Sequence, residues 1–201
     1  MTSAVHPIEV ESYRIMRDRV DLSAWPDHGD RAVVERMIHA TADESFATST
    51  RIGAQAVQRA VDALRASAPV IADAAMVAAG IGGGRATCLL TEVPTAPPGT
   101  TRSAAAIDLA VERHPSGAVW VIGNAPTALF ALLAAFDDGR VDPAAVVGVP
   151  VGYVGAAESK AALWASPLAD CAVTNEGRRG GSPVAAGAVN ALLRLAERTS
   201  S

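Results

Sequence analysis

The stretch Ala144-Ala-Val-Val-Gly-Val-Pro-Val-Gly-Tyr-Val-Gly-Ala-Ala-Glu-Ser-Lys160 predicts, in order, a buried strand, a glycine-rich turn and a helix. The apolar strand stops at Pro150, and the glycines that follow let the backbone turn tightly and approach a ligand. A helix that begins at Ala156 carries polar side chains in its first turn, namely Glu158, Ser159 and Lys160. This turn lies at the carboxyl edge of the predicted sheet, where open α/β proteins bind their ligands.

The glycine spacing in this stretch differs from the known phosphate-binding patterns. Glycines at 148, 152 and 155 do not match the dinucleotide fingerprint, and the stretch lacks the Gly-Lys-Ser/Thr of a phosphate-binding loop. A nucleotide-binding α/β protein remains an alternative hypothesis, which the missing loop argues against.

Strand-like and helix-like segments alternate on both sides of this stretch, from Pro69 onward. The predicted strands are 70–73, 87–93, 118–123, 146–149 and 171–175. A helix through Met76 and Ala79 is predicted after the first strand, and further helices are predicted at 101–113, 126–138, 156–165 and 182–198. Five short apolar strands alternating with helices predict a parallel sheet covered on both faces, a three-layer α/β/α fold.

The N-terminal third has a helical pattern instead. Apolar residues recur at helical spacing in 8–20, 30–43 and 50–67. The length suits one domain with a sizeable core, so we expect a single domain over 1–201, with a helical part at 1–68 and an α/β part at 69–201.

The composition excludes several classes of protein. Half of the residues are hydrophobic but only 4% are aromatic, and the net charge of −4 disfavours a general nucleic-acid surface. No apolar stretch reaches the length that crosses a membrane. Cys88 and Cys171 fall in apolar runs without metal-site spacing, which predicts buried, reduced thiols. We therefore expect a cytoplasmic protein without nucleic-acid or membrane partners.

Polar residues follow the ends of the predicted strands, and these ends meet at one edge of a parallel sheet. The residues are Asp73, Thr91, Asn124, the 148–160 run and 175–181. Ordinary turn chemistry explains Gly, Pro and Asn at any single turn. It explains the whole set less well, because the loops also contain Asn-Ala-Pro-Thr and Arg-Arg-Gly-Gly-Ser.

His39 is the candidate for proton transfer. Glu35 and Asp43, four residues away on either side, share its helix face, and nearby carboxylates favour a charged imidazole. A histidine that keeps its proton near neutral pH can act as a general acid. The alternative is a surface or capping histidine.

Arginines at two predicted helix starts are candidates for binding an anionic small molecule. Arg102 lies at one start, and Arg178 and Arg179 precede Gly180-Gly181-Ser182 at the other. Guanidinium groups suit carboxylates, and helix N-termini offer backbone N–H groups. The alternative is a pair of solvated loops. The sequence shows neither a nucleophile elbow nor clustered metal ligands, so we expect acid–base or positional catalysis without a metal.

Five segments together resemble the precorrin-8X methylmutase family of cobalamin biosynthesis. They are Arg36-Met-Ile-His39-Ala, Thr101-Arg-Ser-Ala-Ala-Ala106, Ile122-Gly-Asn-Ala-Pro-Thr-Ala-Leu129, Gly148–Lys160 and Asn175-Glu-Gly-Arg-Arg-Gly-Gly-Ser182. The sequence departs from the family pattern at Gly82-Gly83-Gly84 and at Ala74-Ala75. These departures concern the shape of the sheet edge and not the reaction.

The resemblance implies a flavodoxin-like fold, a homodimer and no cofactor. It also implies migration of a methyl group from C-11 to C-12 of precorrin-8X, which gives hydrogenobyrinic acid, with His39 supplying one proton. Two alternatives are a non-catalytic tetrapyrrole carrier and the same reaction on cobalt-precorrin-8. The residues expected to bind the tetrapyrrole are Arg14, Arg102, Asn124, Thr127, Gly152, Ser159, Lys160, Arg178, Arg179, Gly180, Gly181 and Ser182.

Overall fold

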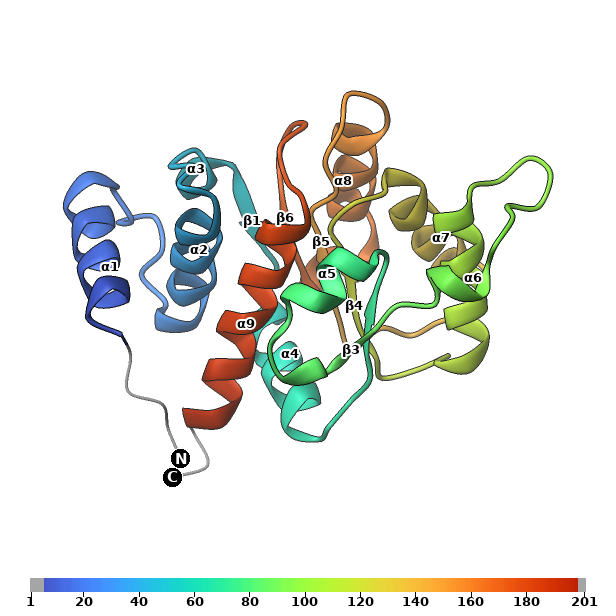
Figure 1. The fold of residues 1–201 in the computed structure, drawn as a ribbon, viewed down its shortest axis with the longest axis horizontal. Helices are drawn as coiled ribbons and strands as arrows, with labels where there is room; N and C mark the ends of the chain where they lie inside the picture. Colours follow the sequence, from blue (N-terminus) through green and yellow to red (C-terminus); the bar gives the residue numbers. More distant parts are fainter. Residues whose placement is uncertain (1–5, 199–201) are drawn as a thin grey trace.

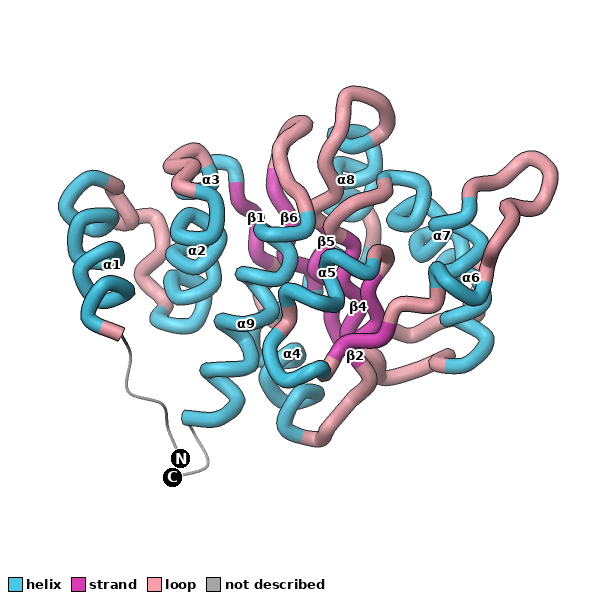
Figure 2. The backbone as a smooth tube through the Cα atoms, in the orientation of Figure 1, coloured by secondary structure: helices cyan, strands magenta, loops and turns pink. Residues whose placement is uncertain are grey.

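A mostly parallel sheet of six strands forms the centre of the molecule, in a computed structural model that describes residues 6–198 (Figures 1 and 2). The ends of the predicted domain, 1–5 and 199–201, lie outside the described residues. The strands are β1 (Thr50–Ile52), β2 (Val70–Ala72), β3 (Ala86–Thr87), β4 (Val119–Ile122), β5 (Ala145–Gly148) and β6 (Ala172–Asn175). Their order across the sheet is β1-β6-β5-β4-β2-β3, and β1 alone is antiparallel to its neighbour.

The five parallel strands have the flavodoxin-like order. Numbered among themselves along the chain they run 2-1-3-4-5, and this order reverses direction between β2 and β4. Ligands of such folds bind outside the carboxyl ends of the strands at that switch point. The carboxyl ends of β2 and β4 are therefore the part of the sheet edge where this rule predicts a ligand.

Nine α-helices surround the sheet within the described range. They are α1 (Pro7–Arg19), α2 (His28–Thr41), α3 (Phe46–Ser49), α4 (Ala56–Arg65), α5 (Ala75–Gly80), α6 (Arg102–Arg113), α7 (Pro126–Asp137), α8 (Ala156–Ala165) and α9 (Ser182–Arg198). Three 3₁₀ turns accompany them: η1 (Gly82–Gly84), η2 (Leu90–Glu92) and η3 (Pro167–Cys171). None of the helices in residues 6–198 is both long and apolar enough to cross a membrane.

Alternating side chains of the strands build two separate cores. Val119 and Val121 of β4 belong to the core under α4, α5 and α9, whereas Trp120 and Ile122 belong to the core under α6, α7 and α8. This alternation follows from the two-residue period of a strand, and both faces are apolar because helices cover both. The predicted three-layer arrangement is confirmed.

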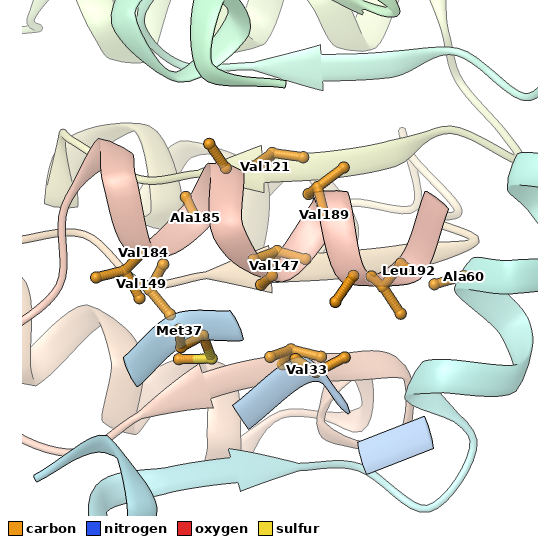
Figure 3. Packing of buried hydrophobic residues seen from close by; sticks show 14 of the residues in the cluster. Val33, Met37, Ala60, Val121, Val147, Val149, Val184, Ala185, Val189 and Leu192 are labelled. Atoms are coloured by element: carbon orange, nitrogen blue, oxygen red, sulfur yellow. The ribbon is translucent and has the colours of Figure 1, made fainter. Parts of the chain in front are cut away.

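Helix α9 lies between the sheet and α2 (Figure 3). Its Ala185 and Val189 pack on the sheet side near Val121, while Val33 and Met37 of α2 approach α9 from the other side. Gly187 permits this contact, because a Cβ there would lie 3.1 Å from the Arg36 carbonyl oxygen. Helix α2 is thus a second layer over α9, and α1 is outermost (Figure 1).

Two sequence predictions were wrong in the N-terminal half. The predicted helix at 50–67 is split, because 50–52 forms β1 and pairs with β6, with Thr50 opposite Asn175. At the end of β1, Gly53 allows a close backbone approach, since a Cβ there would lie 1.9 Å from the Ala169 carbonyl oxygen. The predicted helical part therefore contributes a strand to the sheet.

The second wrong prediction is the strand at 87–93. It is only β3 followed by the turn η2, so Thr91 lies on an exposed turn and not at a strand end. The carbonyls of Leu90 and Val93 accept hydrogen bonds from Arg102 and not from a neighbouring strand. Cys171 is buried as expected, but Cys88 is only partly buried.

Candidate active site

Asp73 fixes the backbone at the switch point of the sheet. It follows β2, is buried, and accepts hydrogen bonds from the backbone N–H groups of Gly123 (2.9 Å), Asn124 (2.9 Å) and Ala125 (2.6 Å). Burial raises the pKa of this carboxyl, and the three N–H groups oppose that shift. Asp73 therefore holds the turn between β4 and α7, and the Asn124 side chain remains exposed.

Two glycine-rich loops join along the neighbouring part of the edge. The Gly181 N–H donates to the Val149 carbonyl (2.9 Å), and the Gly152 N–H donates to the Arg178 carbonyl (3.2 Å). A Cβ at Gly180 would lie 2.2 Å from the Val149 carbonyl oxygen, so this contact requires glycine. We call residues 176–181 the arginine turn. It leads directly into α9, which begins at Ser182.

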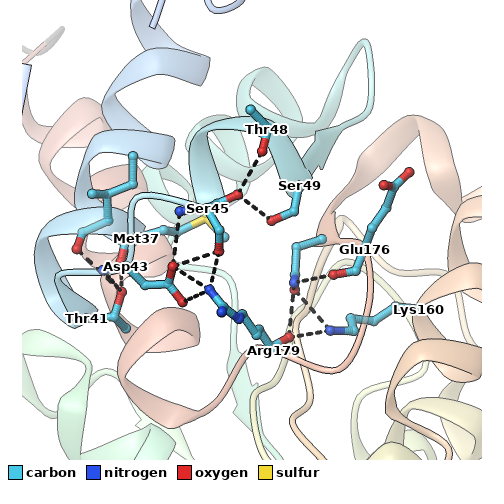
Figure 4. Close-up of polar contacts among 11 residues, drawn as sticks. Met37, Thr41, Asp43, Ser45, Thr48, Ser49, Lys160, Glu176 and Arg179 are labelled. Atoms are coloured by element: carbon cyan, nitrogen blue, oxygen red, sulfur yellow. Dashed lines mark hydrogen bonds and ion pairs between the residues drawn. The ribbon is translucent and has the colours of Figure 1, made fainter. Parts of the chain in front are cut away.

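Lys160 lies beneath the arginine turn, in the first turns of α8 (Figure 4). Its ammonium group donates to Asn175 Oδ1 (3.2 Å) and to the Arg179 carbonyl. Ser159 is also buried, and its hydroxyl donates to the Ala156 carbonyl (3.2 Å). The structure therefore gives Ser159 and Lys160 supporting positions instead of the direct ligand contact that the resemblance implied.

Arg179 links the arginine turn to the segment after α2 (Figure 4). Its Nη1 lies 2.7 Å from both carboxylate oxygens of Asp43 and 2.7 Å from the Ser45 hydroxyl. Although burial raises the pKa of Asp43, the hydrogen bonds from Ser45 and the charge of Arg179 give a net lowering. The end of α2 is thus tied to the loop that starts α9.

His39 lies near the end of α2 and borders an open cleft of about 350 Å³. Its ring stacks on Tyr13 of α1, with 4.6 Å between the ring centroids and 6° between the planes. The Ser12 hydroxyl lies 3.1 Å from His39 Nδ1. The cleft is also lined by Arg36 and Ala40 of α2, Met76 and Gly80 of α5, and Ser182, Pro183, Ala186, Gly187 and Asn190 of α9.

The expected cause of a charged His39 is wrong. Glu35 is bound by Arg17 (2.8 and 2.6 Å) and by Arg31 (3.2 Å), and Asp43 is bound by Arg179. Burial lowers the pKa of His39, the charges of Arg36 and Arg194 lower it further, and Glu9 opposes them. The free protein therefore favours a neutral imidazole at neutral pH.

The other predicted binding residues lie at separate places. Arg102 holds η2 through the carbonyls of Val93 (2.7 Å) and Leu90 (3.0 Å), and Thr127 Oγ1 lies 2.8 Å from the Thr101 hydroxyl. Arg14 pairs with Glu11 and Asp18 on its own helix. Figure 1 shows α6, which Arg102 begins, at the opposite end of the molecule from α1. Arg102 is not among the residues that line the His39 cleft.

Arg178, unlike Arg179, has no carboxylate partner among the described residues of the arginine turn and its surroundings. Arg178 is exposed, and its guanidinium carbon lies 5.8 Å from the centre of the Tyr153 ring. This places an aromatic ring and a cation together at the tip of the joined loops. The start of α9, at Ser182, connects this tip with the His39 cleft.

Sequence reasoning missed Ser12, Tyr13 and Glu9, which surround His39 from α1. Glu9 accepts hydrogen bonds from Arg36 (3.1 Å) and from Arg194 (3.1 Å), and so connects α1 with α2 and α9. The available signal was the spacing of Glu9 and Tyr13, which places them on one helix face. Which helix that face would meet is a property of the tertiary fold.

Comparison with known proteins gives one consistent result. The family model described as precorrin-8X methylmutase (CbiC) matches residues 7–195. A precorrin-8X methylmutase of Sinorhizobium sp. is 42% identical, over 91% of each chain, and a cobalt-precorrin-8 methylmutase of Synechocystis sp. is 38% identical, over 96% of this chain and 97% of its own. A crystal structure of a precorrin-8X methylmutase from Thermus thermophilus superposes with a TM-score of 0.82 at 37% identity, over 96% of each chain.

Proposed function

This chain belongs to the precorrin-8X methylmutase family, and on that basis we propose that it moves a methyl group from C-11 to C-12 of a precorrin-8-type tetrapyrrole. Methylmutases are isomerases, so membership of this family makes the protein an isomerase, as the sequence resemblance implied. Such a rearrangement keeps every atom of the substrate, so the protein has to bind the ring, orient it and move a proton.

The His39 cleft is the observation that carries this proposal. It lies between α2, α5 and α9, next to the ligand-binding edge of the sheet, and it presents one titratable ring held by Tyr13 and Ser12. We assign the general acid to His39. Its imidazole is favoured as neutral in the free protein, and a substrate with many carboxylates would raise its pKa as it binds. The acid is then charged mainly in the complex.

Carboxylate recognition is assigned to the arginine turn. Arg178 is exposed there, and the backbone of Gly180 and Gly181 leads into the N-terminus of α9, which favours anions. The Asn124 and Gly152 loops flank this position along the sheet edge. Arg102 and Thr127 remain predicted contacts that do not line the His39 cleft, whereas Arg14 lies on α1 next to Tyr13 and pairs with Glu11 and Asp18.

We also propose a homodimer, in which a second copy brings Arg102 and Thr127 to the cleft. Helix α1 supports this, because it exposes the apolar side chains of Ile8, Val10 and Ile15 although it carries residues of the site. A cytoplasmic location is proposed as well, since it would keep the free thiols of Cys88 and Cys171 reduced.

The function is tested by incubating the protein with metal-free precorrin-8X and following the absorption spectrum for the chromophore of hydrogenobyrinic acid. A parallel reaction with cobalt-precorrin-8 asks which substrate is preferred, since relatives of both names are similar to this chain. Multiple turnovers support the enzyme. Tight binding without turnover of either substrate would support the tetrapyrrole carrier instead.

A further inference from the structure

Lys160 is the only lysine in the sequence, which contains sixteen arginines. It is also one of the most deeply buried side chains, with 1% of its surface exposed. Lysine and arginine are normally found at the surface unless they are paired. A buried lysine in a chain that otherwise uses arginine therefore requires an explanation.

The ammonium group of Lys160 has neutral partners. It donates to the Asn175 side-chain oxygen and to the Arg179 carbonyl, and among residues 6–198 no carboxylate contacts it. The nearby carboxylates are used elsewhere or face solvent: Glu176 pairs with Arg51 (2.5 Å), Asp43 pairs with Arg179, and Glu158 is exposed on α8. The fold thus keeps a positive charge beneath the arginine turn without a counter-ion of its own.

Burial lowers the pKa of Lys160 to about 8, and no neighbouring charge offsets that shift. Such a group is charged at neutral pH at a cost in stability. Its two hydrogen bonds both end on the frame of the arginine turn, at Asn175 and at the Arg179 carbonyl. The Arg179 side chain in turn binds Asp43 at the end of the helix that carries His39.

We propose that Lys160 is a positioning residue for substrate recognition: it fixes the arginine turn, and a substrate carboxylate bound at that turn becomes its counter-ion. This inference rests on the proposed function, because it takes a polycarboxylate tetrapyrrole as the ligand. The carboxylate binds above the turn, at Arg178 and the backbone N–H groups, and Lys160 acts on it through the layer of backbone between them.

A single lysine makes a direct measurement possible. Protein grown with ¹³C,¹⁵N-lysine carries one labelled side chain, and its Cε and Nζ resonances report the pKa of Lys160 in the intact wild-type protein. We expect a pKa of about 8 in the free protein and a rise of roughly one unit with saturating hydrogenobyrinic acid, since an opposite charge favours the ammonium form. An unchanged pKa with the product bound would overturn the inference.

The variant Lys160→Met tests the same point through affinity. It keeps the length of the side chain and removes the charge, and we expect product to bind roughly 10- to 100-fold more weakly at pH 7. Wild-type affinity should fall as the pH rises through about 8, because the ammonium is lost, whereas the variant should show no such fall. Arg85→Met, which removes an exposed positive charge on the loop after η1, is the matched control and should bind like wild type.

The possible failures are distinguishable. If wild type binds and converts the tetrapyrrole but Lys160→Met binds product within twofold of wild type, the inference about Lys160 is wrong and the proposed function stands. If wild type neither binds product nor turns over either substrate, both fail. Should Lys160→Met not fold, the resonance measurement on wild type still decides the question.

Discussion

The phenol ring of Tyr13 lies face to face with the imidazole of His39, with 4.6 Å between the centroids. The two residues come from different helices, so α1 must be docked for the His39 ring to be held. Stacked rings of this kind contribute about 0.5–1.5 kcal/mol beyond their buried area. The outermost helix of the fold is therefore part of the candidate active site and not an accessory to it.

His39→Ala should lower turnover by roughly 10²- to 10⁴-fold, the usual range for a positioned acid. Product affinity should largely survive, because the proposed carboxylate contacts come from other residues. Steady-state kinetics and product titration measure the two effects separately. His114→Ala, on the loop after α6, is the control. Turnover near the wild-type level in His39→Ala would remove the histidine from the mechanism.

The pH dependence of catalysis should differ between the free enzyme and the complex. Burial and the charges of Arg36 and Arg194 lower the pKa of His39 below its ordinary value, so the acid form in the free protein is lost as the pH rises through that lowered pKa. Substrate carboxylates raise the pKa again in the complex. The descending limb of kcat/KM should therefore lie at lower pH than that of kcat. Coinciding limbs, or the reverse order, would contradict this account.

The lowered pKa of His39 also affects stability. The unfolded chain binds the proton more readily than the folded protein, so stability falls as the pH drops through the ordinary histidine value toward the lowered one. His39→Asn should reduce this loss. Chemical denaturation of both proteins at pH 5.5 and 7.5 compares them.

The alternating strands and helices were predictable because their signals are local. Helices 101–113, 126–138, 156–165 and 182–198 are confirmed almost to the residue, since Pro126 and the glycines before Ala156 and Ser182 mark their starts. Strand β1 was not predictable, because its three residues pair with β6 about 120 positions later in the chain. A segment so short becomes a strand only through that pairing.

The site was predictable in its parts but not in its assembly. The position of His39 and the glycine-rich loops could be identified from the sequence, yet the carboxylates expected to keep His39 charged, Glu35 and Asp43, are bound by arginines instead. Helix spacing places Glu35 near His39, but the fold directs Arg17 and Arg31 onto Glu35 and places Arg36 near the ring. The partners of a charged side chain depend on how the helices pack together, and residue spacing along one helix does not determine that packing.

Asp73→Ala should destabilise the fold by about 1–3 kcal/mol, since it leaves the N–H groups of Gly123, Asn124 and Ala125 without their acceptor. Asp73→Asn keeps one side-chain oxygen and should cost less. Urea denaturation measures the free energy of unfolding of both variants. Asp108→Ala is the matched control: Asp108 pairs with Arg140 near the surface, so its removal should have a small effect. Equal stability of Asp73→Ala and wild type would show that Asp73 does not hold the β4–α7 turn.

Arg178 and Arg102 should respond differently to removal. Arg178 is exposed above the arginine turn, so Arg178→Ala should weaken product binding roughly ten- to a hundredfold, and Lys should restore only part because it loses the planar fork. Arg102 is engaged with the carbonyls of Leu90 and Val93, so Arg102→Ala should also loosen η2, seen as faster hydrogen exchange at 90–93. If both variants bind product as tightly as wild type at low salt, the tetrapyrrole carboxylates bind to residues other than Arg178 and Arg102.

Helix α1 should form part of a contact between two copies of the chain. It leaves Ile8 73% exposed, with Val10 and Ile15 also exposed, and removing such an apolar patch from water is favourable. Light scattering at micromolar concentration should give the mass of a dimer, and Ile8→Asp should shift it toward the monomer. If a second copy completes the site, turnover should fall as the dimer dissociates. The alternative is an interface on α8, which exposes the apolar side chain of Trp164. Trp164→Asp tests it: a dimer that is lost in Trp164→Asp and kept in Ile8→Asp would place the interface on α8. A wild-type protein that is monomeric at every concentration would refute the dimer.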